Sequence, residues 1–329
     1  MKKLLFLILL ISFPNFGQEN IEVREINLEN YEYPYPIDFF EVQAQQEKLS
    51  MAYMFIKAER SNGKTITLLH GKNFNGAYWK TTIDTLTAEG YDVLVPDQIG
   101  FGKSTKPKHF QYSFQQLALN TKKLLESLNI PSTVVMGHSM GGMLATRFAL
   151  MYPETTTKLI LLNPIGLEDW KLKVPYQSID EWYANELDKN YKAIKEYQQE
   201  NYYDGDWNEE YAQWAKLLAG WTLNENYPLI AWNTALTYDM IFTQPVVYEF
   251  HELVIPTLLL IGTRDRTALG KNLVSQDVSA SMGRYDQLGK ITAEKIPAAS
   301  LLELKDVGHL PHIEAFPLYI SSLLEYLKN

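Results

Sequence analysis

After residue 36, apolar side chains recur at alternate positions along the chain. Leu49, Met51 and Phe55 lie two or four residues apart, which places them on one face of an extended segment. This pattern predicts a strand over 49–56, and the apolar residues of 37–42 predict a second one. Together the two segments fit an antiparallel hairpin.

Beyond the hairpin, short apolar runs alternate with longer helical segments. Ser113 is a typical helix cap, and after it Leu117, Leu124 and Leu128 share one helical face. Such alternation is typical of a parallel sheet, in which reactive side chains gather beyond the carboxyl ends of the strands. The predicted strands are 65–69, 91–95, 133–136, 158–162, 257–261 and 300–304, and the other predicted helices are 77–89, 140–151 and 315–327.

The alternation stops at residue 165 and resumes at residue 256. The intervening stretch is helical in pattern and contains six of the seven tryptophans. It also has sixteen acidic but only six basic residues, so it accounts for the whole net charge of −9. We therefore expect a helical lid at 165–255, inserted into a core formed by 37–164 and 256–329.

The first 17 residues have the pattern of an export signal. Lys2 and Lys3 precede an apolar run over 4–13, and a breaker with small residues follows at 14–17. The run is shorter than the roughly 20 residues of a spanning helix, although an uncleaved N-terminal anchor is the alternative. We expect a signal peptide at 1–17, a surface leader at 18–36, and an exported protein, periplasmic or secreted, with no stable membrane insertion after signal removal.

The composition excludes several kinds of chemistry. The chain has no cysteine, which excludes disulfides, thiolate nucleophiles and cysteine-based metal sites. A net charge of −9 argues against a nucleic-acid partner. We expect a small-molecule substrate, no cofactor and no metal, and the sequence does not predict an oligomeric state.

A candidate nucleophile lies between the predicted strand 133–136 and the predicted helix 140–151. The sequence there is Gly137-His138-Ser139-Met140-Gly141, which matches the G-x-S-x-G nucleophile elbow. Glycines two residues before and after the serine let a very tight turn form without Cβ clashes. The pattern predicts that Ser139 stands above the sheet at the start of a helix.

A serine nucleophile needs a base and a carboxylate that orients the base. His309 follows the last predicted strand, and Asp265 follows the strand 257–261, so Ser139, Asp265 and His309 occur in the order expected for an elbow enzyme. His312 is the alternative base, and Asp306 is the alternative acid. The other four histidines are expected to pack, to support loops or to lie exposed.

Two main-chain N–H groups must stabilise the oxyanion that develops during acyl transfer. Met140 directly follows the nucleophile and is expected to provide the first. The loop after the strand 65–69, His70-Gly71-Lys72-Asn73, is expected to provide the second, from Lys72 or alternatively from Asn73.

These motifs together resemble the α/β-hydrolase superfamily over residues 37–329. The elbow, the His70-Gly71 turn, the segment Asp97 to Ser104, the Gly262 to Asp265 turn and Gly308-His309 match that family in order. The resemblance implies a mostly parallel eight-stranded sheet flanked by helices, with a lid between the sixth and seventh strands. It also implies that lid aromatics line an apolar pocket, and the candidates include Trp170, Trp182, Trp207, Trp214, Trp221 and Trp232.

The leading hypothesis is a cofactor-free hydrolase of a carboxylic ester with a small, largely apolar substrate. Ser139 in place of aspartate disfavours haloalkane dehalogenase and epoxide hydrolase chemistry, and His-Gly-Lys-Asn differs from the His-Gly-Gly-Gly of one lipase branch. The alternatives are a carbon–carbon hydrolase of ring-cleavage diketones, a perhydrolase of the chloroperoxidase type, and a non-catalytic binder. A basic pocket residue would favour the diketone hydrolase, whereas residues 165–255 contain no arginine.

Overall fold

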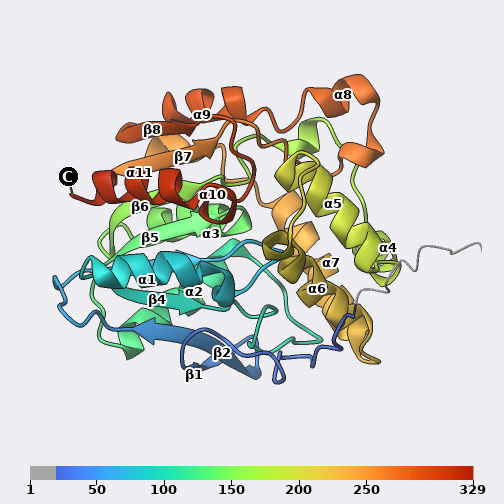
Figure 1. Ribbon diagram of the computed structural model, residues 1–329, viewed down its shortest axis with the longest axis horizontal. Coiled ribbons are helices and arrows are strands. Elements are labelled where there is room, and N and C mark those ends of the chain that lie inside the picture. Colours follow the sequence, from blue (N-terminus) through green and yellow to red (C-terminus); the bar gives the residue numbers. More distant parts are fainter. Residues whose placement is uncertain (1–19, 329) are drawn as a thin grey trace, which may run out of the picture.

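The computed structural model describes residues 20–328 and has one eight-stranded sheet at its centre (Figure 1). The strand order is β1-β2-β4-β3-β5-β6-β7-β8. From β4 onward in this order all neighbours are parallel, whereas β2 pairs with β1 and β4 in antiparallel fashion. The strands are β1 Asp38–Ala44, β2 Glu47–Ile56, β3 Thr65–Leu69, β4 Asp92–Pro96, β5 Thr133–His138, β6 Thr156–Leu162, β7 Thr257–Gly262 and β8 Ala299–Leu304.

The sheet confirms the predicted hairpin and the predicted parallel strands, with ends that shift by up to two residues. Alternate residues of the central strands face opposite layers. In β6, for example, Leu159 and Leu161 pack in one hydrophobic cluster and Ile160 and Leu162 in the other. Both faces of the sheet are therefore buried, as parallel strands require.

Helices cover both faces of the sheet (Figure 1). Side chains of α2 and α3 join the first cluster, and those of α1 and α11 join the second. The predicted cap is confirmed, because the Ser113 hydroxyl accepts a hydrogen bond from Gln116 N–H at 3.0 Å. The core helices are α1 Lys80–Ala88, α2 Phe114–Ser127, α3 Met140–Met151, α8 Gln276–Ala280, α9 Tyr285–Ala293, α10 Pro311–Glu314 and α11 Phe316–Lys328.

Residues 165–255, called the insertion below, are helical and lie at one end of the sheet (Figure 1). Asparagine or serine side chains begin three of its helices: Ser178 forms a capping box, and Asn190 and Asn208 accept main-chain N–H groups. Its main helices are α4 Ile179–Leu187, α5 Tyr191–Tyr203, α6 Glu209–Thr222 and α7 Tyr227–Thr243.

The N-terminal segment 20–36 runs along α6 before it enters β1. Within it Leu28 is fully buried and Tyr33 nearly so, so this part of the predicted leader also contributes to the core. The predicted signal peptide, 1–17, lies outside the described residues. None of the helices within 20–328 combines the length and apolar character needed to cross a membrane.

Candidate active site

The turn between β5 and α3 holds Ser139 in a strained conformation. Its φ of 56° and ψ of −123° lie in a region that non-glycine residues rarely adopt. A Cβ on Gly137 would lie 2.0 Å from the Gly141 carbonyl oxygen, and one on Gly141 would lie 2.2 Å from the Leu69 oxygen. Only glycine fits at these two positions, as the elbow pattern predicts.

Ser139, His309 and Asp265 form one hydrogen-bonded chain. His309 Nε2 lies 3.0 Å from Ser139 Oγ, and His309 Nδ1 lies 2.7 Å from Asp265 Oδ2. Ser139 is 7 % exposed, His309 1 % and Asp265 0 %. Three segments far apart in the sequence thus meet beyond the carboxyl ends of β5, β7 and β8, and all three side chains are buried.

Two further groups hold the Asp265 carboxylate. Asn163 Nδ2 donates to its Oδ2 at 2.9 Å, and the Thr267 main-chain N–H donates to its Oδ1 at 2.8 Å. Burial alone raises the pKa of Asp265, but His309 and these two donors outweigh it and lower the pKa below its ordinary value. Asp265 is therefore an ionised partner for His309, and Asn163 is a positioning residue that the sequence did not reveal.

The alternative base and acid lie elsewhere. His312 is buried and stacks on Trp79 with ring centres 4.6 Å apart, and burial together with nearby His309 lowers its pKa to about 3. Asp306 lies in the turn after β8, where its main-chain oxygen accepts from Arg264 Nε at 3.0 Å. Among the described residues, neither side chain contacts Ser139 or His309 through a hydrogen bond.

The residues expected to donate to an oxyanion lie on two segments beside Ser139. Met140 is the first residue of α3, so its N–H has no partner within the helix. The loop after β3 also reaches the serine, because a Cβ on Gly71 would lie 3.1 Å from Ser139 Cβ. Among the residues that the structure describes, the N–H groups of Lys72 and Asn73 donate to no other main-chain group, so either could serve.

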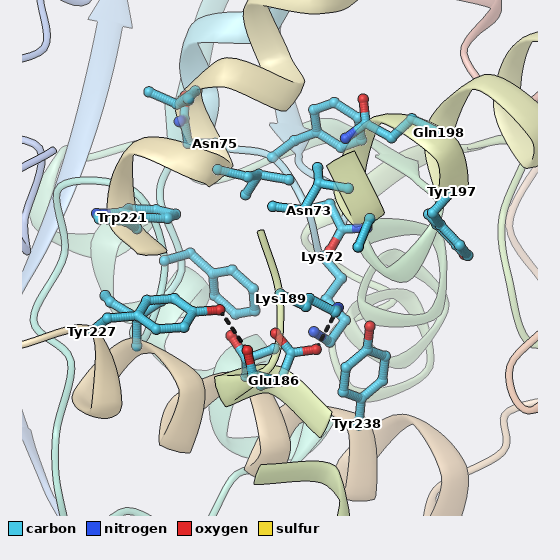
Figure 2. Close-up of a pocket in the computed structure, with 18 of the residues that line it drawn as sticks. Lys72, Asn73, Asn75, Glu186, Lys189, Tyr197, Gln198, Trp221, Tyr227 and Tyr238 are labelled. Atoms are coloured by element: carbon cyan, nitrogen blue, oxygen red, sulfur yellow. Dashed lines mark hydrogen bonds and ion pairs between the residues drawn. The ribbon is translucent and has the colours of Figure 1, made fainter. Parts of the chain in front are cut away.

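A cavity of about 270 Å³ opens between this loop and the insertion (Figure 2). Asn73 lines it and donates to the Tyr202 hydroxyl at 3.0 Å, and the Tyr202 ring stacks on His309 at 4.8 Å. One side-chain layer thus separates the cavity from His309. Of the six tryptophans of the insertion, Trp221 lines this cavity.

The wall of the cavity is less apolar than the sequence led us to expect. Lys72, Glu186 and Lys189 lie in it beside aromatic and aliphatic groups (Figure 2). Basic groups are therefore present although the insertion has no arginine. Within residues 20–328, no three acidic or histidine side chains are grouped as a metal site.

Comparison with known proteins agrees with this architecture. A solved structure of a probable hydrolytic enzyme from Pseudomonas aeruginosa PAO1 is 50% identical, covers 93% of this chain and 98% of its own, and superposes with a TM-score of 0.91. Lipase 3 of Moraxella sp. (strain TA144) is 25% identical over 285 residues, 84% of this chain and 81% of the lipase.

A shorter match is the 2-hydroxy-6-oxo-6-phenylhexa-2,4-dienoate hydrolase of Burkholderia cepacia. It is 35% identical over 112 residues, which are 33% of this chain and 39% of that enzyme. The family model described as "alpha/beta hydrolase fold" matches residues 64–316. Sheet order, elbow and sequence matches thus agree, and the chain belongs to the α/β-hydrolase fold family.

Proposed function

We propose that the protein is a serine hydrolase that cleaves a carboxylic ester of a small substrate through an acyl-enzyme. The observation that carries this proposal is the chain from Ser139 Oγ to His309 at 3.0 Å and from His309 to Asp265 at 2.7 Å. These distances lie within the range for a nucleophile, its base and the carboxylate that orients the base. The similarity to a lipase supports the same reaction class.

In the first half-reaction, Ser139 Oγ attacks the ester carbonyl carbon while His309 Nε2 accepts the hydroxyl proton. The N–H groups of Met140 and of Lys72 or Asn73 stabilise the negative carbonyl oxygen. Asp265 keeps His309 in the tautomer with a proton on Nδ1 and stabilises the imidazolium. The tetrahedral species then collapses, the C–O bond breaks, and His309 gives its proton to the leaving alcohol.

In the second half-reaction, water replaces the alcohol. His309 takes a proton from the water, the hydroxide attacks the acyl carbon, and a second tetrahedral species forms. Its collapse releases the carboxylic acid and returns the proton from His309 to Ser139 Oγ. The atoms and protons of the two half-reactions balance with the protein chain, the ester and one water molecule.

Hydrolysis of short p-nitrophenyl esters tests the proposal. The Ser139→Ala variant should lose at least about a thousandfold in kcat, because removing the nucleophile of a triad disables the whole unit. A fluorophosphonate probe should label the wild type at Ser139, which a non-catalytic binder would not allow. Undiminished hydrolysis by a folded Ser139→Ala variant would contradict the mechanism.

The lysines of the cavity favour a second candidate, a carbon–carbon hydrolase of ring-cleavage diketones. Lys72 and Lys189 are the kind of basic residue that a carboxylate-bearing diketone needs, and the match to the dienoate hydrolase of Burkholderia cepacia points the same way. Turnover of a vinylogous diketone at a higher kcat/KM than any ester would replace the ester proposal by this one.

A further inference from the structure

Three charged side chains lie together in the wall of the cavity (Figure 2). Glu186, in the last turn of α4, has only 7 % of its side chain exposed, and its Oε1 lies 2.5 Å from Lys189 Nζ. Lys72 enters from the loop after β3, and its Nζ lies 3.5 Å above the centre of the Tyr238 ring. Insertion and core thus each contribute a lysine to the same space.

The charges in this group do not cancel. Glu186 pairs with Lys189, whereas Lys72 has the Tyr238 ring as its neighbour and, within residues 20–328, no carboxylate at ion-pair distance. When all three groups are ionised, one positive charge is left over. That excess matches a monoanion such as a carboxylate better than a doubly charged group.

The pKa values agree with this unequal pairing. Burial lowers the pKa of Lys72 to about 7, although Glu186 partly opposes the effect. Burial also acts on Lys189, but Tyr238 and Glu186 outweigh it and raise the pKa of that ammonium group. Lys72 is thus the cation that an incoming anion would stabilise most.

A buried amide with no partner faces the same cavity. Gln198 of α5 lines it and is 1 % exposed, and among the described residues neither its Nε2 nor its Oε1 makes a hydrogen bond. Buried polar side chains in native proteins are nearly always hydrogen-bonded, because leaving one unpaired is destabilising. An amide in this state next to a cavity indicates a ligand that supplies the missing partner.

The cavity lies next to Ser139 and His309, and the Asn73 and Tyr202 side chains separate it from His309. Lys72 has its side chain in the cavity and its main chain in the loop that touches Ser139. The volume of about 270 Å³ is near the lower limit of ordinary ligand pockets, about 300 Å³. Phe74 and Trp221 in the wall give an apolar surface for the rest of such a molecule.

From these observations we infer that the cavity binds a carboxylate group of the substrate. Lys72 and Lys189 supply the positive charge, and the Gln198 amide supplies a hydrogen-bond donor. The substrate of the proposed hydrolase is then a small ester that has a free carboxylate at its far end, with an apolar chain between the two. The identity of the cleaved bond, an ester, rests on the proposed function, whereas the inference of a carboxylate-binding site does not.

Binding to the Ser139→Ala variant tests the site without turnover. Isothermal titration calorimetry would compare monomethyl adipate with the neutral methyl ester in which a carboxamide replaces the carboxylate. The two ligands have nearly the same size, so the difference between their Kd values reports the effect of the negative charge. We expect at least a tenfold lower Kd for the monoester.

Lysine variants in the Ser139→Ala background locate the effect. We expect the preference for the monoester to fall at least fivefold in Lys72→Met. We expect the same fall in the double variant Lys189→Met/Glu186→Gln, in which the second change avoids leaving an unpaired carboxylate. Lys189→Arg keeps the positive charge and should retain most of the preference. Lys192→Met is the matched control, since Lys192 is on α5 with 81 % of its side chain exposed. Thermal unfolding of every variant would show that it is folded.

Two results would overturn the site. One is the absence of any preference for the monoester, including no binding up to its solubility limit. The other is a preference that survives in both lysine variants as fully as in Lys192→Met. Failure of the proposed function has a different signature, which is ester hydrolysis that persists in Ser139→Ala while the calorimetric preference is unchanged.

Discussion

At the scale of single residues, the wall of the cavity contains one polar side chain, Gln198, that we expect to favour ligand binding at the expense of stability. The Gln198 amide is buried with neither polar atom paired among the described residues, and an unsatisfied buried group costs about 1–3 kcal/mol. A leucine of similar size would remove that cost and would also fill the space. The same residue is therefore expected to act in opposite directions on unfolding and on ligand binding.

Gln198→Leu should raise the free energy of unfolding by about 1 kcal/mol and the Tm by roughly 2 °C for a chain of this size. It should weaken binding of a carboxylate-bearing ligand at the same time, by about tenfold for one lost charge-assisted hydrogen bond. Calorimetric unfolding and ligand titration on one preparation measure both. A lower Tm would show that Gln198 is satisfied in the native protein after all.

The sequence revealed site residues that belong to a motif, and it missed site residues whose role depends only on their position in the fold. The meeting of Ser139, Asp265 and His309 was predictable, because strand ends and chain order restrict where these three residues can lie. Asn163 was not, because its contact with Asp265 arises from the pairing of β6 with β7 and has no spacing pattern. The polar cavity was hidden for the same reason, since Lys72 and Lys189 are 117 positions apart and meet only in the fold.

At the scale of elements, the junction of β5 and α3 has the least tolerance for change. Gly141 is the second residue of α3 and lies beside the end of β3, where a Cβ would lie 2.2 Å from the Leu69 oxygen and 2.7 Å from the His70 oxygen. These are main-chain atoms of a central strand and of the loop that follows it, so they cannot move aside independently.

Gly141→Ala should therefore displace Ser139 or the loop after β3. We expect a loss of at least about a hundredfold in kcat/KM for esters, as for other small misplacements of reacting groups, together with a lower Tm. Gly289→Ala is the matched control: Gly289 lies in α9, where a Cβ would meet side-chain atoms of Ile261 and Leu301 at 3.2 and 3.3 Å. Equal activity of both variants would contradict the assigned close packing.

Elements were predictable where periodicity alone decides them. The predicted helix 77–89 is instead a 3₁₀ turn at Gly76–Trp79 followed by α1, because Asn75 caps the turn and the Tyr78 hydroxyl accepts from Gly71 N–H. Helices α8 and α9 lie in a stretch for which the sequence predicted no element. Contacts distant in sequence determine these features, so no local pattern indicates them.

At the scale of the whole molecule, the segment 20–36 connects the insertion to the core. Arg24 N–H donates to the Gly220 oxygen, and the Trp221 indole donates to the Glu25 oxygen, both at 2.9 Å. At the other end, the Tyr33 hydroxyl donates to Asp97 at 2.7 Å. The segment thus holds α6, and with it the cavity wall at Trp221, in a fixed position relative to the sheet.

Leu28 lies between these two anchors and is fully buried, with a φ of 53°. Leu28→Ala should lower the free energy of unfolding by about 3 kcal/mol, the usual cost of a leucine cavity, and the Tm by roughly 6 °C. Because α6 would lose part of its support, KM should rise more than kcat falls. Val23→Ala, in the same segment but at a side chain 48 % exposed, should change stability by less than about 0.5 kcal/mol. Urea unfolding and ester kinetics measure these effects. If Leu28→Ala and Val23→Ala have the same free energy of unfolding and the same KM, the segment covers the surface without supporting the cavity.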